Sequence, residues 1–482
     1  MKEKVFPSLM ILVGVTGVSG CASIPIHAGV KDVQTLVESR GEPHIRWNQG
    51  RPEDVAVAQA IQSMLKEELT VEDVVQIALL NNSDLQVTFE ELGIAQADLV
   101  QAGLLWNPVF AGHVRFPNKS GGATNTEFSV SQNFLDLFLR PLRKKLAATQ
   151  LDAVRLRVSD AVLNLSADVR AAYYTLQGAE HSRAMFEAVV QAAQAAAELA
   201  ERQHAAGNIN DLDLANEQAA FQQTKLDLTR SEAEVLAARE RLNRLMGLST
   251  DPSWKISQQL PQLTAMEPSP EELETLALTQ RLDLAAARQE VQVFEQSLTL
   301  TRRGVVPAVN VGVDTERDPN RTTVTGPSFE VELPVFDRKQ AAIARAEAQL
   351  RQARQRVAAL ETQARSEVRS ARNRVLVARQ MIERYQEIMI PLREKIVAES
   401  QRHYNFMLIG TFQLLQAKRE EVQAYREYIE AFRDYWTART DLGKAVGGRL
   451  VAAATSDHSV AEQTEPPKEA THHHHHGGGE PK

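Results

Sequence analysis

The sequence predicts a mainly α-helical chain with a smaller β portion, in which one structural unit occurs twice. Three observations predict this class. The two halves of the 482-residue chain align with each other at an offset of about 200 residues. Each half contains a pair of short runs rich in strand-forming residues. Each half also contains stretches with helical spacing that are far longer than the helices of ordinary globular domains.

The duplication is visible in residues that recur in the same order. Thr70–Asp73 opens the first half and Ser269–Glu272 opens the second, and both segments read as a helix N-cap followed by an acid at the third helical position. Further matches are Ala78 with Ala277, Asp84 with Asp283, Ile209 with Ile409, Leu214 with Leu414 and Gly247 with Gly447. We therefore predict repeats at 69–248 and 269–448, joined by a proline-containing linker at 249–268.

Each repeat is predicted to contain one β-hairpin. The expected strands are Val109–Phe116 and Thr126–Phe134 in the first repeat, and Ala308–Thr315 and Ser328–Phe336 in the second. The last run alternates apolar and polar residues, which gives a strand one apolar face. Four strands cannot close a barrel, yet a sheet that crosses lipid must close so that its backbone groups are paired. A trimer would supply about twelve strands, within the size range of outer-membrane barrels.

The second repeat contains the longest helical run. Between Arg338 and Ile409 there is no glycine and only Pro391 interrupts the pattern, so about 70 residues predict a rod on the order of 100 Å. Apolar residues recur along this run at steps of three and four, as in a heptad seam. The seam consists of Ile343, Ala346, Leu350, Ala353, Val357, Leu360, Ala364, Val368, Ala371, Val375, Ala378 and Ile382. Because small and large residues nearly alternate, we expect close packing in a ring of helices.

The N-terminus has the zones of a bacterial export signal. Two lysines lie among the first four residues, and a mostly apolar stretch ends in the small residues of Val18–Cys21. That ending resembles a lipobox, which implies that residues 1–20 are removed and that Cys21, the only cysteine, carries lipid. Residues 21–68 would then form a lipid-anchored extension. The alternative is an ordinary cleaved signal with an incidental cysteine.

Location and partners are constrained further by composition. The residue directly after Cys21 is Ala22 and not aspartate, which favours delivery to the outer membrane. Beyond the signal no apolar run reaches the ~18 residues that a membrane helix needs, so any part that crosses a membrane is expected to be β. The net charge of -8 and the pI near 5.9 give no electrostatic reason to bind nucleic acid.

Two motifs connect these features to a known family. They are Ala206–Leu214 and Tyr404–Lys418, at corresponding positions in the two halves. Together with the signal and the duplication, they resemble the lipoprotein branch of the TolC family of outer-membrane efflux proteins, over Leu69–Gly448. The resemblance implies a homotrimer with a twelve-stranded β-barrel in the outer membrane and an α-barrel across the periplasm. It also implies a periplasmic adaptor and an inner-membrane resistance-nodulation-division transporter as partners.

The resemblance places a periplasmic aperture at the ends of two helical hairpins. Carried over residue by residue, the aperture and inter-hairpin bonding positions fall on Asp213, Tyr404, Gln413 and Gln416, with Asp211 nearby. The family often has acids on the second hairpin where glutamines stand here, so we expect a polar but less negative aperture. Alternatively, the two aspartates cap the helix that begins after Asn210. The cap is the preferred reading for Asp211, and both readings stand for Asp213.

The C-terminal residues 449–482 are polar and predicted to be disordered. They contain five consecutive imidazoles, on His472, His473, His474, His475 and His476. Imidazole is a common ligand of copper, zinc and nickel, and a flexible run makes an adaptable, weakly selective site. The alternative is a cloning tag. Because several lipid-bearing relatives export metal ions, we expect heavy metals as candidate substrates and no tightly bound cofactor.

An enzyme is not expected. The chain has no His-Glu-x-x-His, no phosphate-binding Gly-Lys-Ser/Thr loop and no Gly-x-Ser-x-Gly elbow. The remaining alternative is a periplasmic coiled-coil adaptor or structural lipoprotein without a pore. An adaptor would share the heptads and the lipid, but it would not need two β-hairpins placed symmetrically in a duplicated chain. The sequence therefore favours a passive channel in a tripartite efflux pump.

Overall fold

The structure is a computed structural model, and it describes residues 29–118, 123–249, 253–264 and 268–450. The chain divides into a unit at 1–450 and a second at 451–482, and the described residues belong to the first. The signal at 1–20, Cys21 and the histidine run at 472–476 lie outside the described residues.

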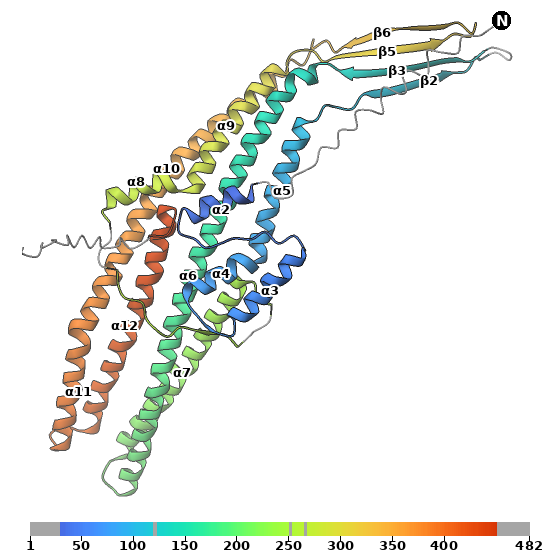
Figure 1. Ribbon diagram of the computed structural model, residues 1–482. Coiled ribbons are helices and arrows are strands. Elements are labelled where there is room, and N and C mark those ends of the chain that lie inside the picture. The colour runs from blue at the N-terminus through green and yellow to red at the C-terminus, as the bar shows by residue number, and fades with distance from the viewer. Residues whose placement is uncertain (1–28, 119–122, 250–252, 265–267, 451–482) are drawn as a thin grey trace, which may run out of the picture. The chain divides into compact units, whose positions relative to one another are not determined.

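An extension precedes two repeats with the same order of elements (Figure 1). The extension comprises α2 (Val30–Glu38), α3 (Pro52–Met64) and β1 (Glu68–Leu69). The first repeat comprises α4 (Val71–Asn81), α5 (Ser83–Gly103), β2 (Val109–Arg115), β3 (Asn125–Asn133), α6 (Leu135–Ala205) and α7 (Asp211–Met246), and β4 (Lys255–Ile256) follows. The second repeat comprises α8 (Pro270–Gln280), α9 (Leu282–Arg303), β5 (Val309–Arg317), β6 (Thr323–Val331), α10 (Gln340–Arg384), the π-helix η1 (Tyr385–Met389), α11 (Ile390–Asn405) and α12 (Thr411–Val446).

Both repeats begin with the helix caps that the sequence predicts. The side chain of Thr70 accepts a hydrogen bond from the backbone N–H of Asp73, and the side chain of Ser269 accepts one from Glu272. In each case the acid bonds back to the backbone N–H of the cap residue, which completes a capping box. Local sequence therefore sets the start of α4 and of α8.

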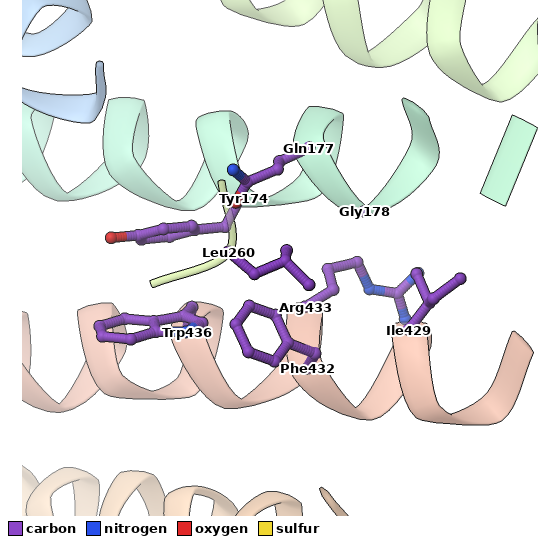
Figure 2. A pocket seen from close by; sticks show the side chains of 8 residues that line it. All are labelled: Tyr174, Gln177, Gly178, Leu260, Ile429, Phe432, Arg433 and Trp436. Carbon is purple, nitrogen blue, oxygen red and sulfur yellow. The ribbon is translucent and has the colours of Figure 1, made fainter. Parts of the chain in front are cut away.

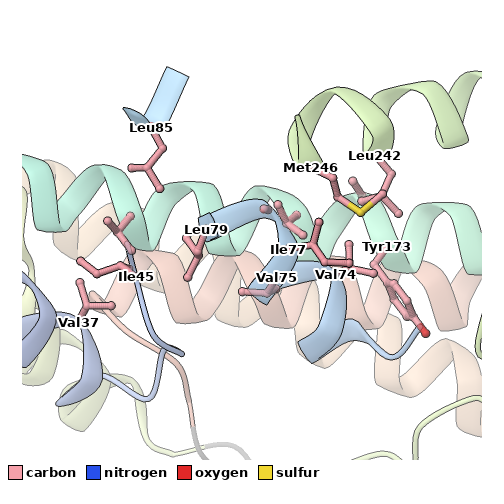
Figure 3. Packing of buried hydrophobic residues seen from close by; sticks show 14 of the residues in the cluster. Val37, Ile45, Val74, Val75, Ile77, Leu79, Leu85, Tyr173, Leu242 and Met246 are labelled. Atoms are coloured by element: carbon pink, nitrogen blue, oxygen red, sulfur yellow. The ribbon is translucent and has the colours of Figure 1, made fainter. Parts of the chain in front are cut away.

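The core lies where short helices cover long ones. One apolar cluster joins α2, α4, α5, α6 and α7, with Val74, Ile77 and Leu242 fully buried (Figure 3). A second cluster joins α8, α10 and α12 around Val375 and Tyr435. Helix α6 packs against both α7 and α12, so the two repeats share one long central helix.

The heptad seam of α10 is confirmed. Nine of its twelve residues are buried, namely Ala346, Leu350, Ala353, Ala364, Val368, Ala371, Val375, Ala378 and Ile382. The other three, Ile343, Val357 and Leu360, are partly buried. The long run itself differs from the prediction in one respect. Its interruption is the π-helix η1, which begins before Pro391.

The two β-hairpins form one antiparallel sheet in the order β2-β3-β5-β6. The strands of the first hairpin lie within a residue or two of their predicted ends. The prediction for the last strand, Ser328–Phe336, is wrong, because β6 runs over Thr323–Val331. Pro327 lies inside β6, which is an edge strand of the described sheet, and edge strands are where sheets accommodate proline. The next proline, Pro334, lies beyond the strand end.

Among the described helices, none is both long enough and apolar enough to cross a membrane.

Candidate functional site

The turn between α6 and α7 forms the first candidate tip. Gly207 has a positive φ of 76°, its N–H donates to the carbonyl of His204, and the N–H of Asn208 donates to Gln203. This is the hydrogen-bond pattern of a Schellman cap, which favours glycine at the left-handed position. Asn210 then caps α7, because its side chain accepts a bond of 2.8 Å from the N–H of Asp213.

The two aspartates of this tip are therefore not the cap residues. Asp211 and Asp213 lie in the first turn of α7, where their charge favours the helix dipole. The carboxylate of Asp211 is 97% exposed and lies 2.7 Å from Nε2 of His204, so it ties the end of α6 to the start of α7. The carboxylate of Asp213 is half-buried and has no hydrogen-bond partner among the described residues.

Sequence reasoning missed a charged group one turn above Asp213. Glu217 is buried on α7, and burial raises the pKa of its carboxyl group. Arg419 of α12 opposes that rise, and Asp213 adds to it. This arrangement brings charges of the two repeats near one another close to the tips. The sequence around Glu217 does not single it out, because its burial is a property of the folded chain.

The turn between α11 and α12 forms the second candidate tip. The N–H of Met407 donates to Tyr404 and the N–H of Leu408 donates to His403, both at 2.9 Å, as in the first tip. Met407 thus occupies the left-handed position that glycine takes in the first tip, with φ 57° and a side chain 93% exposed. Left-handed backbone costs a non-glycine residue roughly 1–2 kcal/mol.

The two glutamines of this tip bond within their own helix. The Oε1 atom of Gln413 accepts a hydrogen bond of 3.0 Å from the N–H of Gly410, which helps to cap α12. Gln416 donates to Glu420 one turn further on, also at 3.0 Å. Tyr404 is half-buried near the end of α11. In the described part of this chain no hydrogen bond joins Asp213 to Tyr404 or to either glutamine, so the inter-hairpin bonds stay a prediction.

The sheet has two chemically different faces, and its register defines them. Residues directly opposite in antiparallel strands share a face. One face carries the apolar residues Phe110, Val114, Phe128, Val130, Val309, Val311, Val313, Phe329 and Val331. The other face carries polar pairs, among them Arg115 with Glu127 at 2.7 Å and Ser328 with Asp314 at 2.8 Å.

The apolar face is largely exposed in the single chain. Phe329 is 81% exposed, and Phe110 and Val313 are also exposed. An exposed apolar surface of this extent marks a lipid-facing or protein-facing site. The polar face is cross-linked by hydrogen bonds between strands, including one from Asn125 to Glu316. The sheet can thus separate an apolar environment from an aqueous one.

Charged side chains connect the extension with both repeats. Arg170 of α6 donates two bonds to Glu42, at 2.7 and 2.8 Å, and both residues are nearly buried. Glu72 accepts from the same guanidinium at 3.3 Å. Arg40 donates to the carbonyl of Gln280 at the end of α8. The extension is therefore bonded to the first repeat through Glu42 and to the second through Arg40.

The crevice between α6 and α12 is small (Figure 2). Tyr174 stacks on Trp436 with ring centroids 5.3 Å apart, and Phe432 lies beside them. Gly178 allows close approach, since a Cβ there would lie 3.1 Å from Arg433. The crevice has room for little more than one water molecule, far less than the roughly 300–1,000 Å³ of ligand pockets. We interpret it as a packing seam between the repeats.

The described residues contain no group of three or more His, Cys, Asp or Glu side chains that could hold a metal ion. The histidine run at 472–476 is outside that search.

Comparisons with known proteins agree with this arrangement. The cobalt-zinc-cadmium resistance protein CzcC of Cupriavidus metallidurans is 24% identical over 283 residues, which is 56% of this chain and 64% of that protein. The match thus spans less than two thirds of that relative. The CmeC outer membrane channel of Campylobacter jejuni aligns with a TM-score of 0.68 at 16% identity, over 80% of this chain and 87% of that chain. A CusC structure aligns with a TM-score of 0.66 at 17% identity, over 78% and 92%.

The family model described as outer membrane efflux protein matches residues 74–248 and 273–448. The two matched segments each contain the α-helices, the β-hairpin and the long helical hairpin of one repeat. Since they cover most of the residues, this chain belongs to the outer membrane efflux protein family.

Proposed function

We propose that this protein is the outer-membrane channel of a tripartite efflux pump and that it conducts solutes passively from the periplasm to the exterior. The two-faced sheet is the observation that carries the proposal. Its apolar face suits the hydrocarbon of a membrane, and its hydrogen-bonded polar face suits a water-filled interior. Conduction of this kind requires no catalytic residue in the chain.

The proposed channel is a homotrimer. In the described sheet, β2 pairs only with β3 and β6 pairs only with β5, so each outer strand has one unpaired edge. A sheet with open edges is not stable in lipid, because each unpaired backbone group costs several kcal/mol. Three chains whose β2 and β6 edges meet would close the sheet into a twelve-stranded barrel. The paired helical hairpins would then line the periplasmic part of the conduit.

The aperture of the proposed channel is at the two tips. Asp213 supports this role because its carboxylate has no hydrogen-bond partner among the residues that the structure describes. We propose that it bonds to Tyr404 of a neighbouring hairpin when the channel is closed. A periplasmic adaptor would hold the tips, and an inner-membrane resistance-nodulation-division transporter would supply the energy. Lipid on Cys21 would anchor the chain to the outer membrane.

Heavy-metal ions are the substrate class that we propose. The relative CzcC is a cobalt-zinc-cadmium resistance protein. The sequence adds five consecutive histidines near the C-terminus, whose imidazoles can bind copper, zinc or nickel. The proposal assigns the tail to weak metal capture and assigns selection to the inner-membrane transporter.

The experiment that tests the channel is conductance of the purified full-length protein in planar lipid bilayers. We expect discrete conductance steps from a species that migrates as a trimer without heating and as a monomer after boiling. A soluble rod that is released from the membrane by delipidation, with no conductance, would instead identify a pore-free lipoprotein. Both readouts are needed, because an adaptor can also be membrane-anchored.

A further inference from the structure

The second repeat contains one residue more than the first within its long helix. Near the core, buried Val169 and Leu176 of α6 correspond to buried Val368 and Val375 of α10. At the tips, Gly207 corresponds to Met407, since the two turns have the same hydrogen bonds. The residue numbers of equivalent positions in the two repeats therefore differ by one more at the tips than near the core. One residue has therefore been added between residue 375 and the second tip.

The π-helix η1 is where this extra residue is accommodated. The N–H of Ile390 donates to the carbonyl of Tyr385, five residues earlier, whereas an α-helix bonds residues four apart. A single added residue inside an α-helix produces a π-turn of this kind, because the helix widens locally and keeps its register on both sides. The corresponding stretch of the first repeat is an uninterrupted part of α6.

A second local weakness adjoins the π-helix. Pro391 follows Ile390 directly and has no N–H to donate to the preceding turn. Its ring also crowds the carbonyl of the residue four positions earlier, which an α-helical turn would aim at it. The helix thus has a widened turn and a missing hydrogen bond side by side.

Apolar packing stops at the same place. The last buried side chain before the π-helix is Ile382, and no residue of η1 or α11 is buried. In the first repeat, Ala197 and Ala200 of α6 are buried well toward the tip. Helix α11 is attached to α12 by polar contacts instead, among them Arg393 with Glu420. Such contacts at the protein surface, partly exposed to water, contribute about 0–1 kcal/mol each.

We propose that η1 is a hinge on which α11 and the second tip swing relative to the well-packed α10. The swing would displace the second tip while the first hairpin, with its continuous α6, stays in place. This inference rests on the proposed channel function, since the swing matters as the movement that widens the aperture. The extra residue, and not the proline, is assigned as the cause of the hinge.

Amide hydrogen exchange on the purified full-length protein tests the hinge without reference to conduction. We expect residues 392–402 of α11 to exchange faster than residues 192–202 of α6. Deletion of Gln386, an exposed residue of η1, should restore a continuous α-helix and slow exchange in 392–402 by at least about tenfold. The matched control is Pro391→Ala, which keeps the extra residue and should leave most of the fast exchange. Equal slowing in both variants would assign the weakness to the proline and overturn the proposal.

A second variant tests the same idea in case the deletion variant does not fold. One alanine inserted after Ala188 gives α6 the extra residue that it lacks, and it should speed exchange in 192–202. No change there would contradict the link between the added residue and local opening. In bilayers, the Gln386 deletion should lower the frequency of openings at unchanged trimer yield. Normal openings of the Gln386 deletion would overturn the hinge but not the channel. Absence of conductance in the unmodified protein would overturn the proposed channel, and the exchange result would still stand.

Discussion

At the residue scale, the partly buried carboxyl group of Asp160 has a shifted pKa that affects stability. The pKa of Asp160 on α6 is raised to about 6, because burial disfavours its carboxylate and Asp283 adds repulsion. The amide of Asn164 and the positive charges of Arg281 and Lys444 oppose that rise only partly. Asp160 therefore carries an energetic cost at neutral pH that no neighbour fully removes.

This cost gives a pH-dependent prediction for Asp160→Asn. The pKa of an unperturbed aspartate is 3.8, so between about pH 4 and pH 6 the folded state binds more protons than the unfolded state. Stability supplied by the protonated form is lost as the pH rises through that window. The substitution should raise the unfolding temperature by a few degrees at pH 7.5 and change it little at pH 4. Asp98→Asn, at an exposed site of α5, is the control. An equal shift at both pH values would contradict the assignment.

The aperture assignment predicts the effect of a double substitution at the tips. Asp213→Ala combined with Tyr404→Phe should raise single-channel conductance, because it removes both partners of the proposed bond between hairpins. Asp211→Ala is the matched control, since that carboxylate pairs with His204 of its own hairpin. Conductance measured in planar bilayers should be unchanged in the control. The gating role is refuted if the double variant also conducts like the unmodified protein.

At the scale of the elements, a buried ion pair is one of the contacts that hold the extension on the first repeat. Glu42 and Arg170 form two charge-assisted hydrogen bonds, and such bonds are stronger than neutral ones. Strand β1 also pairs in parallel with β4, which joins the extension to the segment after the first repeat. The extension therefore depends on both side-chain and backbone contacts for its position.

Removal of one partner of this pair should be strongly destabilising. Glu42→Ala leaves the guanidinium of Arg170 buried with only the longer contact to Glu72, and losing a buried partner typically costs about 3–5 kcal/mol. Denaturant unfolding measures the loss, and limited proteolysis should cut the extension earlier. Glu38→Ala, which removes only exposed contacts with Gln34 and His44, is the control and should have little effect. A similarly small effect at Glu42 would show that the extension is held by other contacts.

At the scale of the whole molecule, the sheet and the long helical hairpins are both built from the two repeats. Each repeat contributes two strands and one helical hairpin, and α6 of the first repeat contacts α9 and α12 of the second. Among the residues that the structure describes, an apolar sheet face and two sheet edges have no partner. A trimer in a membrane is the assembly that would cover all of them.

Neighbouring residues of β3 provide a matched test of the two faces. Val130 lies on the apolar face and Ser131 on the polar face. Val130→Lys should reduce the yield of heat-modifiable trimer in the outer membrane, because a lysine facing the centre of the lipid costs about 2–4 kcal/mol per chain. Ser131→Lys should assemble normally and alter ion selectivity. Equal trimer yields from the two variants would show that the assigned faces do not correspond to lipid and water.

The histidine tail is tested in cells. Deletion of residues 472–476 should lower resistance to at least one of copper, zinc and nickel if the imidazoles assist export. Replacement of the five histidines by five asparagines controls for tail length and should have the same effect. Equal survival with and without the histidines across these metals would exclude the role.

Local sequence predicted much of this fold. The capping boxes at Thr70 and Ser269, the heptad seam of α10 and the glycine at the first tip depend on residues within a few positions of one another. Such patterns act through short-range hydrogen bonds and helical periodicity, so they are readable without a structure. The candidate aperture residues were assigned differently, through the resemblance of two short motifs to a known family, and their role in the aperture stays a prediction.

Tertiary structure alone decided the rest. The pairing of Glu42 with Arg170, the raised pKa of Asp160 and the extent of β6 through Pro327 depend on which distant segments meet, and no local pattern specifies those contacts. Locating the π-helix needs both sequence and structure. The numbering of the repeats reveals the extra residue, but only the folded helix shows which turn widens to accommodate it. The sequence by itself determined the repeated elements, because periodicity is local, and the structure decided their register, faces and hinge, because these arise from contacts across the chain.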